Sequence, residues 1–142
     1  MLSWKLSQLQ ILVAIGLLSA CGSYEFTLND KLLKRPQQLF TDYRIGDKHL
    51  HRCIKQAIFD NNISQASELK DLNCSHAGIT SINGLESFSQ LKRVKLSHNK
   101  ISNIDNIRTL QKLEVLHISH NRILDFLPIL SLVQLQELDV SS

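Results

Sequence analysis

The sequence predicts an α/β solenoid, in which short parallel strands stack into one sheet and a helical cap covers one end. An apolar pattern opens at Leu69, Leu91, Leu113 and Leu135, and its copies lie 22 residues apart. An amphipathic helical stripe precedes the first copy. A fixed period of this length is typical of coils that cannot bury their own apolar side and therefore stack on their neighbours.

Residues 36–68 are expected to form the cap. Asp47 is the expected N-cap of a helix, and Asn61 and Asn62 are expected to close it. Apolar residues recur between them at helical spacing. They are Leu50, Cys53, Ile54, Ala57 and Ile58. This stripe needs a surface, and the open end of the first coil needs a cover, so the two should pack together.

Each repeat begins with the run L-x-x-L-x-L, whose last apolar residues lie two apart, as in a strand with one buried face. The later apolar residues of each repeat are spaced three residues apart, which favours a turn-rich or 3₁₀ return path. We place the repeats at residues 69–90, 91–112 and 113–134, with a partial repeat at 135–142.

One polar column interrupts the apolar register. Asn99 and Asn121 follow Ser-His in the second and third repeats, whereas Ala77 holds the place in the first. Asn tolerates tight turns, and its side-chain amide can bond the backbone of the coil it turns. We therefore expect these two residues to form an Asn ladder.

These repeats resemble the leucine-rich repeats of the short bacterial kind found in internalin-type proteins. The resemblance covers residues 69–142 and departs from the family pattern at Ala77. It implies a right-handed coil with the parallel sheet on its concave, ligand-binding face and a turn-rich or 3₁₀ convex side. It also implies a small helical cap at the N-terminus.

Two cysteines fall in the cap and the first repeat. Cys53 lies on the helical stripe, and Cys74 takes an inward strand position. In an exported protein an even pair favours a disulfide, which would fasten the cap to the solenoid. The alternative is two buried free thiols, because cysteine is a common small core residue.

The N-terminus predicts export. Residues 1–20 combine one lysine, an apolar stretch and small final residues, as a secretory signal peptide does. Leu18-Ser19-Ala20-Cys21 resembles the lipobox of bacterial lipoproteins, which implies lipidation of Cys21 and a membrane anchor. Gly22 implies sorting to the outer membrane if the source has two membranes. The alternative is an ordinary cleaved signal peptide followed by a chance cysteine.

Residues 21–35 form the predicted tether between lipid and domain. The chain carries a formal net charge of +3, which points to no particular polyanion. Because the chain is exported and its last repeat is acidic, we expect no nucleic-acid partner.

The strand positions between the inward residues should point outward from the sheet. The residues expected to contact a partner there are Asn73, Arg93, Lys95, His117 and Asp139. The charges of this face either form a recognition patch or simply keep the protein soluble.

Histidines recur with the period of the repeat. His76, His98 and His120 are 22 residues apart, and His117 lies three places before the last. Clustered imidazoles could bind a metal or respond to pH. We nevertheless expect no metal site and interpret these histidines as a variable surface column, because no carboxylate or cysteine joins them at metal-ligand spacing.

The sequence contains no Gly-rich phosphate loop, H-E-x-x-H or G-x-S-x-G motif. We therefore expect no enzyme activity, no catalytic residue and no cofactor, but a protein-binding role in the bacterial cell envelope. The alternative of a different class is a structural lipoprotein that binds glycan or cell wall.

The sequence stops inside the fourth repeat, before its Asn position. Three explanations stay open. The chain is a fragment of a longer protein, or a second copy covers the last coil in an end-to-end dimer, or the half coil suffices with Ser141 and Ser142 folded over the edge.

Overall fold

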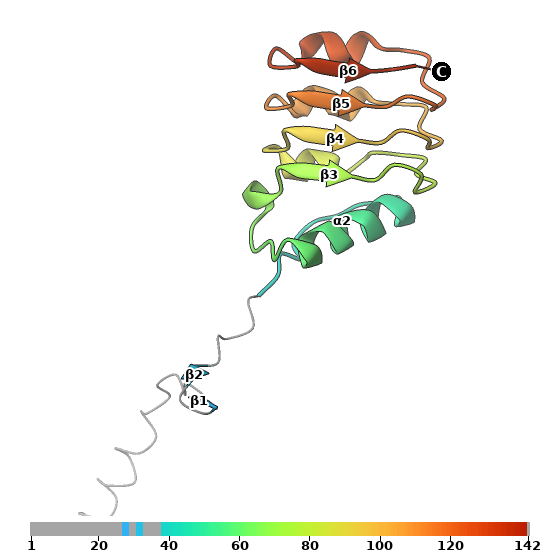
Figure 1. Cartoon of the computed structure of the whole chain (residues 1–142). Helices are drawn as coiled ribbons and strands as arrows, with labels where there is room; N and C mark the ends of the chain where they lie inside the picture. Colours follow the sequence, from blue (N-terminus) through green and yellow to red (C-terminus); the bar gives the residue numbers. More distant parts are fainter. Residues whose placement is uncertain (1–26, 29–30, 33–37, 142) are drawn as a thin grey trace, which may run out of the picture. The chain divides into compact units, whose positions relative to one another are not determined.

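The computed structural model describes residues 27–28, 31–32 and 38–141. Four parallel strands form one sheet in chain order, and coils stack along the sheet (Figure 1). The strands are β3 (Asp71–Asn73), β4 (Arg93–Lys95), β5 (Val115–His117) and β6 (Glu137–Asp139). Each pairs with the next at the same position of the repeat, so Leu72 lies beside Val94 and Val94 beside Leu116. The predicted leucine-rich repeat solenoid is confirmed.

The chain returns to each new strand through a 3₁₀ helix behind the sheet, as the spacing of threes predicts (Figure 1). These helices are η2 (Leu85–Phe88), η3 (Asp105–Thr109) and η4 (Leu127–Ser131). They follow a first short turn, η1 (Ala66–Glu68), that leads into β3. Between sheet and 3₁₀ helices lies one continuous apolar core, in which Phe88, Leu91, Leu96 and Leu113 are fully buried.

The helix α2 (Lys48–Asp60) caps the first coil and buries Leu50, Ile54 and Ile58. It begins where the sequence predicts, because the Asp47 carboxylate accepts hydrogen bonds from the backbone N–H groups of His49 and Leu50. It ends at the predicted Asn61, whose backbone N–H donates to the carbonyl of Ala57.

The Asn ladder joins each coil to the one before it. The Asn99 side-chain oxygen accepts from Ile79 N–H at 2.9 Å, and its Nδ2 donates to the carbonyls of Cys74 and Leu96. Asn121 repeats the pattern one coil later, accepting from Ile101 N–H at 3.0 Å. Backbone groups that the turn leaves without a partner are thereby satisfied inside the stack.

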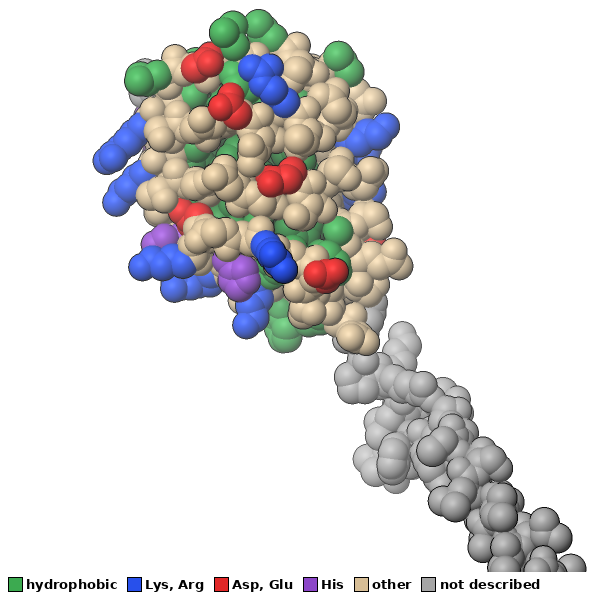
Figure 2. Space-filling model, turned by 180° about the vertical axis from the view of Figure 1, so that it is seen from behind, with side chains coloured by type: hydrophobic (Ala, Val, Ile, Leu, Met, Phe, Trp, Pro, Cys, Tyr) green, Lys and Arg blue, Asp and Glu red, His purple; other side chains and the backbone are tan. Residues whose placement is uncertain are grey.

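The C-terminal end of the stack is less buried than its apolar register suggests. Phe126, Leu138 and Val140 occupy inward positions of the repeat, yet 40–44% of their surface is exposed. Each has a neighbouring coil on one side only within the described residues. Hydrophobic side chains gather at this end of the repeat domain, farthest from α2 (Figure 2).

The N-terminal segment forms a separate unit, within which β1 (Thr27–Leu28) pairs antiparallel with β2 (Lys31–Leu32). This pairing falls inside the predicted tether, where no strand was expected from the sequence. The predicted signal peptide and Cys21 lie outside the described residues. Among the helices that the structure describes, none is long and apolar enough to cross a membrane.

Candidate partner-binding face

Outward side chains of the sheet form two rows across the concave face. One row runs through Asp71, Arg93, Val115 and Glu137. The other contains four of the five predicted contacts in successive strands, namely Asn73, Lys95, His117 and Asp139. Along β3 and β4, the middle residue is buried and the residues on either side of it point outward. Because the strands pair at matching positions, the outward residues of successive strands lie side by side.

Nearest the cap, the face contains a hollow of about 520 Å³ between α2 and the first two strands. We name it the cap hollow. It is lined by Cys53, Gln56, Ala57, Asp60, Asn61, Asp71, Leu72, Asn73, Arg93 and Lys95. Three of the predicted contact residues therefore meet in one place, whereas His117 and Asp139 lie farther along the sheet.

Charges in the cap hollow are not equally engaged. The Arg93 guanidinium lies 2.5 Å from the Asp71 carboxylate, and the Asp60 carboxylate accepts a hydrogen bond from Gln56 at 2.7 Å. Within residues 38–141, no ion pair includes Lys95. Its ammonium is the cation of this hollow that remains available to a ligand.

The helical side of the cap hollow was missed from the sequence. Gln56 and Asp60 lie on α2, Asn61 follows its last residue, and no strand pattern points to them. A signal was present, because Gln56 and Asp60 follow Cys53 by three and seven residues. Residues at this spacing share one helix face, and Cys53 was already expected to face the first coil.

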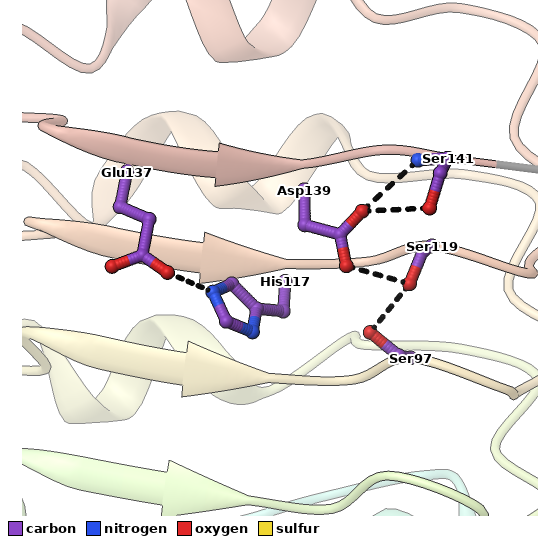
Figure 3. A network of polar contacts seen from close by, with 6 residues as sticks. All are labelled: Ser97, His117, Ser119, Glu137, Asp139 and Ser141. Carbon is purple, nitrogen blue, oxygen red and sulfur yellow. Dashed lines mark hydrogen bonds and ion pairs between the residues drawn. The ribbon is translucent and has the colours of Figure 1, made fainter.

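A polar network covers the other end of the face (Figure 3). His117 Nε2 lies 2.7 Å from the Glu137 carboxylate. Ser119, which is only 4% exposed, has a hydroxyl that donates to Asp139 and contacts the Ser97 hydroxyl at 2.9 Å. Hydrogen bonds from Ser141 and Ser119 lower the pKa of Asp139.

This network contains Ser, His and Asp side chains, but they are not joined as an activated nucleophile requires. Nucleophilic catalysis needs the hydroxyl bonded to a base, which a third group then orients. Here Ser119 bonds to a carboxylate, while His117 bonds to a different one. The arrangement fixes the positions of polar groups on an open surface.

The histidine column, formed by His76, His98 and His120, is exposed and stacked. Neighbouring ring centroids lie 4.2 and 4.3 Å apart, with planes tilted by only 12° and 17°. Parallel rings direct their nitrogen lone pairs side by side and not toward one point. In the described part of the chain, no three His, Cys, Asp or Glu side chains converge as a metal site would require.

Two side-chain links hold the cap on the first coil. A disulfide joins Cys53 of α2 to Cys74. Asp47 is the second link, because its other carboxylate oxygen accepts from the backbone N–H and hydroxyl of Thr80, at 2.9 and 2.7 Å. Burial pushes the pKa of Asp47 upward, but the hydrogen bonds from Leu50, Thr80 and His49 outweigh it and hold the pKa far below its ordinary value.

Comparison with known proteins gives matches at the level of structure. No protein-family model matches the sequence, and a search of curated proteins finds no match. The internalin InlF from Listeria monocytogenes matches 65% of this chain with a TM-score of 0.60 and 26% identity. The internalin InlC2 from the same species matches 52% with a TM-score of 0.51 and 30% identity.

The matched parts are short relative to those proteins. This chain covers 29% of InlF and 33% of InlC2. Both similarities agree with the parallel sheet and the 22-residue period of the coils. The repeat domain is therefore similar in fold to the leucine-rich repeat domains of internalin-type proteins.

Proposed function

We propose that this protein binds a protein partner, without catalysis, through the concave strand face and chiefly through the cap hollow. The observation that carries the proposal is the hollow itself, where Lys95 remains available beside exposed hydrogen-bonding side chains of α2 and β3. Buried anchors in a hollow, surrounded by polar groups, are typical of protein interfaces. The internalin fold supports the same role.

A site-specific photo-crosslinker in the producing cells tests this proposal. At Gln56, which is exposed on α2, it should give a discrete crosslinked product, whereas at Thr109, which is exposed on η3, it should give none. Adding Lys95→Glu should remove the product, because reversing the charge opposes the partner's electrostatic complementarity. Equal crosslinking at both positions, or an unaffected product in the Lys95→Glu chain, contradicts the site.

The charge-reversed protein also needs a folding control. Lys95→Glu with Arg93→Glu should leave the melting temperature within a few degrees of the original, since exposed ion pairs contribute at most about 1 kcal/mol. Circular dichroism during heating measures this. A large fall would mean that lost binding reflects unfolding and not the loss of contacts.

We propose further that Cys21 carries the lipid that anchors the protein in a bacterial cell envelope, at the outer membrane of a two-membrane cell. The lipobox-like run before Cys21 supports this. The intact mass of protein extracted from membranes should equal residues 21–142 plus acyl chains. A Cys21→Ser chain should lack those acyl chains; an unacylated natural protein would contradict the anchor.

A structural role in binding cell-wall glycan is the alternative. Exposed polar side chains on the same face would support such contacts. Sedimentation with purified cell-wall sacculi separates the two roles. Sedimentation of the original protein with the sacculi favours the wall, whereas a protein left in the supernatant favours the protein partner.

We also propose an end-to-end dimer through the last coil. Leu124, Leu130 and Val133 are 80–95% exposed, and β6 has a paired neighbour on one side only within the described sheet. A two-fold axis would place the β6 edges of two copies together. Sedimentation equilibrium should give a dimer that Leu138→Lys disrupts. A monomer, or a longer natural protein by intact mass, rejects this arrangement.

A further inference from the structure

The histidine column is not part of the proposed partner-binding face, and its geometry is regular. Its three residues follow β3, β4 and β5, at the same place in three successive coils. All three adopt a left-handed backbone, with φ between 51° and 58°. This conformation is uncommon for residues other than glycine, and it turns the three rings outward as one regular stack.

Two positively charged residues lie close in sequence to the stacked histidines. Lys100 and Arg122 come two residues after His98 and His120, and both are exposed. Their backbone N–H groups donate to the carbonyls of Ile79 and Ile101 in the preceding coils, so the two residues also lie in register along the stack. No ion pair within residues 38–141 includes either of them.

The other titratable neighbours of the column are few. His98 faces His76 and His120 in the stack and feels the charge of Asp139 from β6. On the cap side, the ring of His49 from α2 lies beside Gly78 in the first turn. Partial desolvation, together with repulsion from the two flanking imidazoles, lowers the pKa of His98.

We propose that His76, His98 and His120, flanked by Lys100 and Arg122, form an acid-dependent binding strip for a linear phosphate polymer. The spacing of the rings places up to three new charges in a row when the column is protonated. A chain of phosphates can neutralise several of them at once, which removes their mutual repulsion. Neutral rings leave only the two flanking cations.

Because protonation and binding are thermodynamically linked, the direction in which the affinity changes with pH can be stated. A ligand that prefers protonated imidazoles raises their pKa and binds more tightly as the pH falls. If binding raises the pKa of one ring by about one unit, the affinity rises about tenfold across the titration. Lysine and arginine side chains in general are charged across this range, so the pH dependence is assigned to the histidines alone.

Fluorescence anisotropy with labelled inorganic polyphosphate and the full chain in detergent tests the strip. The original protein should bind at least about tenfold more tightly near pH 5 than near pH 8. His76→Asn with His98→Asn and His120→Asn should remove this difference, because Asn tolerates the left-handed backbone but does not titrate. His51→Asn, outside the column, should preserve it.

Other arms separate the possible failures. Lys100→Ala should weaken binding at both pH values. Inorganic phosphate at the same phosphate concentration should compete poorly, and equal competition would contradict a linear ligand. If the triple variant unfolds in acid, NMR titration of the original protein decides: polyphosphate must raise the pKa of the three column imidazoles. An unchanged pKa, or a pH dependence that the folded triple variant retains, overturns the proposal.

Discussion

Leu116 and Leu138 occupy the same position in successive coils, but their surroundings differ. Leu116 is fully buried between coils, whereas Leu138 is 44% exposed in the last described coil. At the opposite end of the stack, Leu72 is 2% exposed because α2 covers the first coil. The repeat pattern therefore sets the direction of a side chain, while its neighbours set the burial. Stability should follow the neighbours.

The largest expected effect on stability comes from truncating these two leucines, which tests the comparison directly. Leu116→Ala should lower the free energy of unfolding by about 4 kcal/mol, since it removes a fully buried side chain. In the monomer, at protein concentrations too low for the proposed dimer, Leu138→Ala should cost less than about 1.5 kcal/mol, because much of its surface is already in water. Urea denaturation measures both. Equal costs would show that the last coil is covered in solution.

Removing one rung of the Asn ladder comes next. Asn99→Ala should cost at least about 3 kcal/mol, because Ile79 N–H and the carbonyls of Cys74 and Leu96 lose their partner inside the stack. Asn103→Ala, on the exposed return path, should cost less than about 1 kcal/mol. Thermal unfolding of both variants provides the measurement. Similar melting temperatures would mean that the ladder does not couple the coils.

At the capped end, Cys53→Ala with Cys74→Ala should lower the free energy of unfolding by about 3 kcal/mol, in the chain-entropy model for a loop of this length. The urea midpoint measures the loss. Adding reductant should lower the stability of the original protein and leave the variant unchanged. Two free thiols in the denatured, unreduced original protein would contradict the bond.

Asp47→Asn should have the smallest effect at neutral pH, about 1–2 kcal/mol. Its larger effect concerns acid. The folded-state pKa of Asp47 lies far below the unfolded one, so its stabilisation is complete above about pH 5 and is lost as the pH falls further. Between about pH 5 and pH 2, the original protein should therefore lose more stability than the variant. Parallel losses in urea denaturation would exclude this link.

Much of the repeat region follows from sequence because its information is local and periodic. The run from Leu91 to Leu96 specifies both a strand and its buried face, and β4 (Arg93–Lys95) lies inside it. The N-cap at Asp47 and the helix end at Asn61 are likewise local signals. Each depends on residues within a few positions along the chain.

The remaining features depend on distant contacts. The link from Asp47 to Thr80 spans 33 residues, and nothing near Asp47 distinguishes it from an ordinary N-cap. From the sequence, His76 and His98 could be predicted only to lie in neighbouring coils. Their stacking could not, because the outward direction of the rings depends on the left-handed backbone. The cap hollow requires the packing of α2 on β3, which no repeat pattern describes.

The Asn ladder also bears on how such a domain can change in length. The Asn99 side chain bonds to the backbone of the coil before it, and Asn121 bonds in the same way to the coil that contains Asn99. A whole additional coil would therefore preserve every rung, whereas an insertion between a strand and the Asn that follows it would shift that amide away from its backbone partners. Duplication of one repeat in the gene is thus the change in length that this architecture tolerates best.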